Sequence, residues 1–157
     1  MISADAYLHF VDKALDGMLR TVVDLGDTIA NERLELDQTN TPYAIVNHCI
    51  GVIEFWAGHK VAGRPSDRDR NAEFLASGSN ADLVERVRVT REQLAVDVAA
   101  AQFDQPCVGQ DRPDTSNIPE GCTQGGALVH VLEELTQHRG QLEVTADVLK
   151  VKGGQLA

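Results

Sequence analysis

The chain has 157 residues, of which 43% are hydrophobic and 4% aromatic, and its formal net charge is -10. This length suits one domain over residues 1–157, and the aliphatic, aromatic-poor composition favours an all-α fold. The acidic charge argues against binding to nucleic acid or anionic membrane, and the lack of a bilayer-length apolar run or a signal-peptide pattern predicts a cytoplasmic protein.

Two amphipathic helices are predicted in the N-terminal part of the chain. Ser3 suits the N-cap of the first helix, and apolar residues recur after it at steps of three and four as far as Ile29. Thr41 suits the N-cap of the second helix, with Pro42 at its first position, where the missing N–H is not needed. We expect this second helix to run to about Ala62.

The connections on either side of the third helix are expected to be long. Gly63-Arg64-Pro65 ends the second helix, and the charged segment through Arg70 predicts a loop, followed by one short turn over 71–75. The third helix should begin near Asn80 and end before the segment 106–120, which contains three prolines and predicts a second long loop.

A fourth helix follows the glycine-containing stretch 121–126 and should end before Gly153-Gly154. None of the four helices can bury its apolar stripe alone. We therefore expect a single-domain four-helix bundle with long connections between the second and third helices and between the third and fourth.

Three side chains on two of these helices form a candidate metal site. Glu134 and His138 are four residues apart, so both lie on one face of the fourth helix beside its apolar stripe. His48 lies within the apolar arc of the second helix and points toward the core edge. Two histidines and one carboxylate leave positions open for water or substrate, which is typical of a catalytic metal site.

The same residue pattern has simpler interpretations. His48 alone is typical of a partly buried histidine bonded to a backbone carbonyl, and a Glu–His pair at this spacing is common on solvated helix faces. His130 continues the four-residue ladder, but helical drift places it roughly 80° from His138, so we interpret it as peripheral. Cys49 and Trp56 are predicted to be core residues, and Cys107 with Cys122 is at most a weak pair.

The order of three short segments resembles one family over nearly the whole chain. The segment HVLEELTQHRGQ at 130–141 is similar to the last-helix signature of the DinB-like metal-binding bundles. The segments NHCIGVIEFW at 47–56 and RDRNAEF at 68–74 resemble matching places in the mycothiol-dependent branch. That branch includes the mycothiol S-transferases and the N-terminal domain of mycothiol-dependent maleylpyruvate isomerase.

The resemblance implies a function for the candidate site. It implies that His48, Glu134 and His138 bind a divalent metal, with zinc expected and nickel compatible, and that mycothiol is the thiol co-substrate. The expected activity is metal-dependent S-transfer of this thiol to electrophilic small molecules in detoxification, by a homodimer. Four polar side chains beside these positions are candidates for binding the thiol: Asn47, Arg68, Arg70 and Gln141.

Two other functions use the same ligands. One is a non-catalytic metal-binding module that serves in stress or in an interaction with a partner. The other is a metal-dependent hydrolase, in which the ion activates water instead of a thiol. The residues that would separate these functions line the mouth of the site, in the loops 65–75 and 106–122, where sequence patterns are least informative.

Overall fold

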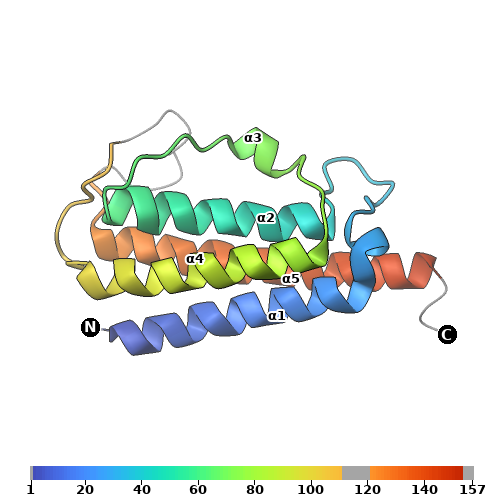
Figure 1. Cartoon of the computed structure of the whole chain (residues 1–157), viewed down its shortest axis with the longest axis horizontal. Helices are drawn as coiled ribbons and strands as arrows, with labels where there is room; N and C mark the ends of the chain where they lie inside the picture. The colour runs from blue at the N-terminus through green and yellow to red at the C-terminus, as the bar shows by residue number, and fades with distance from the viewer. Residues whose placement is uncertain (1, 111–120, 154–157) are drawn as a thin grey trace.

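Five helices and one π-helical stretch make up the computed structural model, which describes residues 2–110 and 121–153 (Figure 1). They are α1 Ala4–Ala30, α2 Pro42–Ile53, the π-helical η1 Glu54–Val61, α3 Arg70–Glu73, α4 Asn80–Ala100 and α5 Gln124–Lys152. The all-α four-helix bundle is confirmed, with α3 as a short addition. The predicted loop beyond residue 110, as well as Gly154, lies outside the described residues.

The helix starts follow local capping chemistry. The Ser3 hydroxyl accepts from the N–H of Ala6 at 3.1 Å, and the Thr41 hydroxyl accepts from the N–H of Ala44 at 3.1 Å. Pro42 occupies the first turn of α2, as expected. One difference lies in α1, which is interrupted at Gly26, where φ is 71°. This left-handed conformation suits glycine and bends the last turn of α1.

The second half of the predicted second helix is π-helical. The helix axis continues from α2 into η1, but at its end the N–H of Ala62 bonds to the carbonyl of Ala57, five residues back, at 3.0 Å. A π-helical segment has more residues in each turn and changes which side chains share a face. No pattern in the sequence indicated this change. It redirects the residues that follow Ile53 relative to those of α2.

The path of the chain explains the long connection 62–79. In Figure 1, α2 and α4 run in the same direction, so the chain must return along the length of the bundle between them. This return segment carries α3 across the outer side of α2 (Figure 1). It therefore places residues of the loop against the helix that carries His48.

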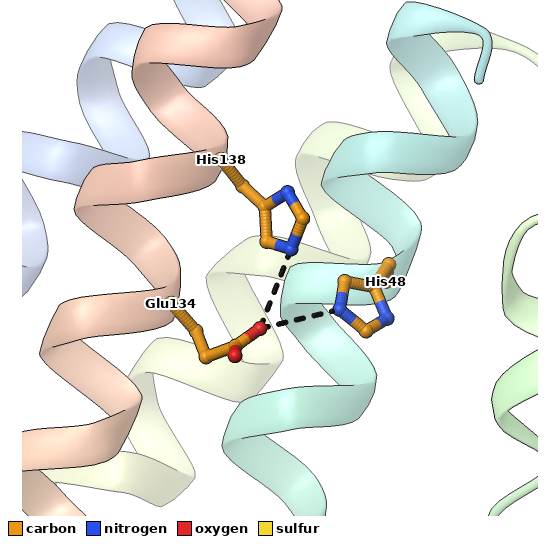
Figure 2. Close-up of side chains that lie close together, drawn as sticks. All are labelled: His48, Glu134 and His138. Atoms are coloured by element: carbon orange, nitrogen blue, oxygen red, sulfur yellow. Dashed lines mark ion pairs between the residues drawn. The ribbon is translucent and has the colours of Figure 1, made fainter. Parts of the chain in front are cut away.

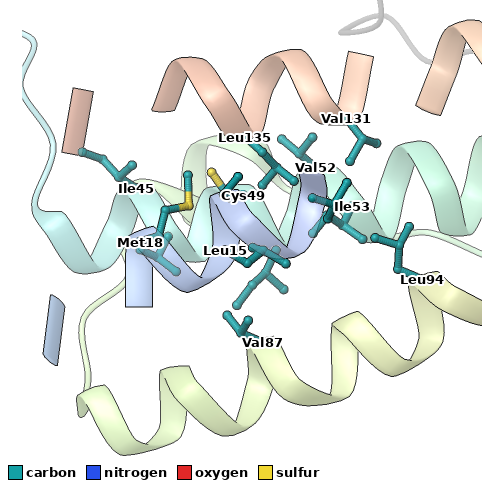
Figure 3. Packing of buried hydrophobic residues seen from close by; sticks show 14 of the residues in the cluster. Leu15, Met18, Ile45, Cys49, Val52, Ile53, Val87, Leu94, Val131 and Leu135 are labelled. Carbon is teal, nitrogen blue, oxygen red and sulfur yellow. The ribbon is translucent and has the colours of Figure 1, made fainter. Parts of the chain in front are cut away.

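The core of the bundle is formed by aliphatic side chains from all four long helices (Figure 3). Leu15 on α1, Ile53 at the end of α2, Leu94 on α4 and Leu135 on α5 are fully buried. Each such side chain contributes about 1.5–3 kcal/mol when removed from water. This packing fixes α2 and α5 relative to each other, and these helices carry the candidate site.

Two further predictions are settled by burial and bonding. Cys49 and Trp56 are buried in the core, as expected. Cys107 and Cys122 are not joined by a disulfide, although the N–H of Cys107 donates to the carbonyl of Cys122 at 3.4 Å. Of the helices in the described part of the chain, none combines the length and the apolar character that crossing a bilayer requires.

Candidate metal centre

The three predicted ligands converge between α2 and α5 (Figure 2). Oε2 of Glu134 lies 3.5 Å from Nε2 of His48 and 3.3 Å from Nε2 of His138. One potential ligand atom from each residue lies within 4.8 Å of the other two. The tertiary structure thus brings together side chains that are 86 residues apart in the chain, from His48 to Glu134.

Hydrogen bonds at the other ring nitrogens orient both histidines. Nδ1 of His48 lies 2.7 Å from a carboxylate oxygen of Glu73, and Nδ1 of His138 lies 2.8 Å from the amide oxygen of Gln141. A carboxylate and an amide oxygen accept hydrogen bonds, so each Nδ1 donates. In the neutral rings, each Nε2 therefore presents a lone pair toward Glu134. A partner at the second ring nitrogen is the usual arrangement for a metal-ligating histidine.

The electrostatics of this cluster favour a cation at its centre. The imidazoles of His138 and then of His48 beside this carboxylate outweigh the effect of burial and hold the pKa of Glu134 well below its usual range. Burial opposes protonation of His138, but the Glu134 carboxylate beside it and its hydrogen bond with Gln141 outweigh burial and raise its pKa. The carboxylate thus stays ionised, and a positive charge beside it is stabilised.

The donor set and its spacing fit a metal ion. Nε2 of His48 is buried and has no hydrogen-bond partner, and the whole residue is only 1% exposed. Zinc binds nitrogen and oxygen at about 2.0–2.1 Å in tetrahedral sites, which separates neighbouring ligand atoms by about 3.3–3.4 Å. The separations of 3.3 and 3.5 Å around Oε2 of Glu134 are close to that value. Three protein ligands would leave a coordination position open.

His130 lies closer to the cluster than its helical angle predicted. Its Nε2 is 3.7 Å from Oε1 of Glu134, and its ring packs edge-on against Trp56 with centroids 4.8 Å apart. With Glu133 and Glu134 it forms a second group of three potential ligands. The Glu133 side chain is 63% exposed, however, and it already bonds Nδ1 of His130 at 2.9 Å. We therefore favour the group around His48.

Three of the four candidate thiol-binding residues bond to other protein groups. Asn47 donates to the backbone carbonyl of Glu73 at 2.9 Å and accepts from Arg86 at 2.6 Å. Arg68 forms an ion pair with Glu73, and Gln141 bonds His138. These contacts hold the surroundings of the cluster in place, and a role in substrate binding stays a prediction.

Arg70 differs from the other three candidates. It is exposed, and its guanidinium carbon lies 5.3 Å from the centroid of the Phe74 ring. Phe74 in turn is stacked on His48, with centroids 4.3 Å apart. Arg70 therefore lies at the surface beside the cluster.

Sequence reasoning missed Glu73. It lies at the end of α3, bonds His48 and Arg68, and belongs to a segment whose path depends on the fold. Glu73 also lines a polar cavity of about 530 Å³, with Asn47, Glu54, Arg68 and Arg86. The only early signal was its place within the segment 68–74.

Cys49 does not supply a thiolate, although it follows His48 in the chain. Burial, and then the negative charges of Glu134 and Glu73, raise the pKa of its thiol far above the usual range. Its side chain packs in the core. Cys49 is therefore a core residue and not the nucleophile of this cluster.

Comparison with known proteins agrees with the fold. A family model described as mycothiol-S-transferase matches residues 6–149, a span that includes all three cluster residues. The crystal structure of a conserved protein from Enterococcus faecalis has a TM-score of 0.71, with 13% identity, and covers 95% of this chain and 98% of that chain. At that identity the likeness supports the helical fold alone. A search among curated proteins finds no match.

Proposed function

The chain belongs to the mycothiol S-transferase family, and we propose that it catalyses metal-dependent transfer of mycothiol to electrophilic small molecules. The observation that carries the metal dependence is the convergence of three ligand atoms from His48, Glu134 and His138. Two alternative functions use the same ligands: a metal-binding module without catalysis, and a metal-dependent hydrolase. The experiments on metal content and conjugation distinguish them from the transferase.

These three residues would hold the ion, and zinc or nickel suits two imidazoles and one carboxylate. A bound divalent ion would lower the pKa of a coordinated thiol and supply a nucleophilic thiolate near neutral pH. Glu134 offsets part of the ion's charge, while Glu73 and Gln141 hold the two imidazoles in the tautomer that leaves Nε2 available.

The remaining residues of the site would bind and orient the substrates. Mycothiol is rich in hydroxyl groups and carries no net charge, so the acidic protein does not repel it. We assign Arg70 to contacts with this thiol, because Arg70 is exposed and lies beside the Phe74 ring that covers His48. The electrophile would then meet the bound thiol at the coordination position that the three protein ligands leave open.

Metal content is the first test. The purified protein, His48→Ala and His9→Ala are compared by elemental analysis after dialysis against trace divalent metals. His9 is exposed and outside the cluster, so His9→Ala is a matched histidine control. We expect about one ion per chain in the wild type and in His9→Ala, with a large loss in His48→Ala. Equal metal content in all three proteins would rule out the proposed centre.

Conjugation is the second test. The metal-loaded protein is mixed with a bimane electrophile and with mycothiol, glutathione, bacillithiol or no added thiol, and conjugate formation is followed. We expect the fastest metal-dependent reaction with mycothiol. Metal binding without conjugation to any thiol would favour the binding module or the hydrolase. The homodimer implied by the family stays a prediction, which light scattering of the purified protein can test.

A further inference from the structure

We propose that Glu73, held by Arg68, is a positioning residue that fixes the tautomer and orientation of His48. Oε2 of Glu73 accepts from Nδ1 of His48 at 2.7 Å, while Nε2 of the same ring faces Glu134. Arg68 donates to both carboxylate oxygens of Glu73, from Nε at 2.6 Å and from Nη2 at 2.9 Å. The inference rests on the proposed function, because it takes His48 as a metal ligand.

Several contacts hold Glu73 in this position. The Arg68 side chain is largely buried, and Asn47 on α2 bonds the backbone carbonyl of Glu73 at 2.9 Å. The next residue, Phe74, is stacked on the His48 ring at 4.3 Å between centroids. The end of α3 is therefore attached to α2 through both Asn47 and His48, and the Glu73 carboxylate has little freedom to turn away from the imidazole.

A glycine on α2 provides the space that this carboxylate occupies. Gly51 lies one turn after His48, and a Cβ atom at this position would clash with Oε1 and Cδ of Glu73. Glycine weakens a helix relative to alanine, so helix formation gives no reason for it here. Close approach of the Glu73 carboxylate to the α2 backbone does explain this glycine.

The chemical consequence follows from the donor and acceptor inventory. An ionised carboxylate only accepts hydrogen bonds, so it keeps the proton of neutral His48 on Nδ1. Nε2 then retains its lone pair, and this nitrogen is buried without a hydrogen-bond partner. A carboxylate behind a ligating histidine also raises the basicity of the ligand. Glu73 thus prepares His48 for an ion that Glu73 does not contact.

The test uses the full chain with Glu73→Ala, Gly51→Ala and the double variant. The tautomer of His48 is read by nitrogen NMR of the metal-free proteins at mildly alkaline pH. Zinc affinity is read by competition with a chromogenic chelator, and folding is checked by circular dichroism. We expect His48 in the wild type to be protonated on Nδ1, and each single variant to lose this preference. Zinc should bind about 10- to 100-fold more weakly to both single variants.

Two comparisons separate positioning from general loss of structure. Glu54→Ala removes another carboxylate from the same cavity wall and leaves the His48–Glu73 bond in place, so its zinc affinity should match the wild type. Gly51→Ala should have no further effect on zinc affinity once Glu73 is absent, because the clash is then removed.

An unchanged His48 tautomer in Glu73→Ala, or an additive effect of the two changes, would overturn the inference. If the wild type binds no zinc, the proposed function fails, and the NMR comparison still decides whether Glu73 fixes His48.

Discussion

The sharpest quantitative prediction concerns Glu134→Gln, which keeps the shape of the side chain and removes its charge. Oε2 of Glu134 is the atom shared by His48 and His138, at 3.5 and 3.3 Å, so this change removes the central ligand of the proposed centre. Replacing a residue behind a ligand typically costs about 10- to 100-fold in metal affinity. Replacing the ligand itself should therefore cost at least about 100-fold.

The magnitude follows from binding linkage. At a free zinc concentration of about 1,000 times Kd, the wild type gains about 4.1 kcal/mol of stability, and a 100-fold weaker variant gains only about 1.4 kcal/mol. For a domain of this size, about 1 kcal/mol corresponds to about 2–4 °C in Tm. Zinc should thus raise Tm by about 8–16 °C in the wild type and by about 3–6 °C in Glu134→Gln.

The assay is differential scanning calorimetry of each protein with zinc and with a chelator. Comparing each protein with its own metal-free form removes the effect of the lost ion pairs on stability. Glu133→Gln is the matched control. Glu133 is the preceding residue on α5, bonds His130 and does not belong to the group of His48, Glu134 and His138. A full zinc increment in Glu134→Gln would refute the reasoning. A loss of the zinc increment in both variants would instead favour the group of His130, Glu133 and Glu134.

Three further predictions test the site and the core. The pKa of His138 is raised, so a proton competes with the metal for this side chain. Zinc affinity should be constant above this pKa and fall about tenfold per pH unit below it, as competition titrations at a series of pH values would show. Cys49 is buried and its thiol pKa is raised by burial, so it should resist iodoacetamide at neutral pH in the native protein and react after denaturation, as mass spectrometry would show. Leu94→Ala, at a site with no exposed area, should lower the free energy of unfolding by about 2–5 kcal/mol, whereas Val96→Ala, at 62% exposure, should change it by less than about 0.5 kcal/mol in urea titrations.

Much of the candidate site could be predicted because its signals are local. The four-residue spacing of Glu134 and His138 places them on one face of any regular helix. His48 shares a face with apolar residues of α2, and burial of that face brings it to the core edge. The resemblance of short segments then connected two helices that spacing alone could not connect.

The tertiary structure decided features that depend on distant parts of the chain. His130 is one example, because its ring packs edge-on against Trp56 on η1 with centroids 4.8 Å apart, a contact that helical angle on α5 does not predict. The π-helical stretch after Ile53 is another, since its hydrogen bonds have no sequence signature.

Sequence by itself determined the four amphipathic helices, the Ser3 and Thr41 caps and the shared face of Glu134 and His138, because periodicity and spacing along a helix fix which side chains share a face. Only the tertiary structure placed Glu73 behind His48, since the connection 62–79 has no repeating pattern. Its path follows from α2 and α4 running in the same direction, and from the space that Gly51 leaves beside α2 (Figure 1). Contacts between segments are set by how the helices pack, and local sequence does not encode that arrangement.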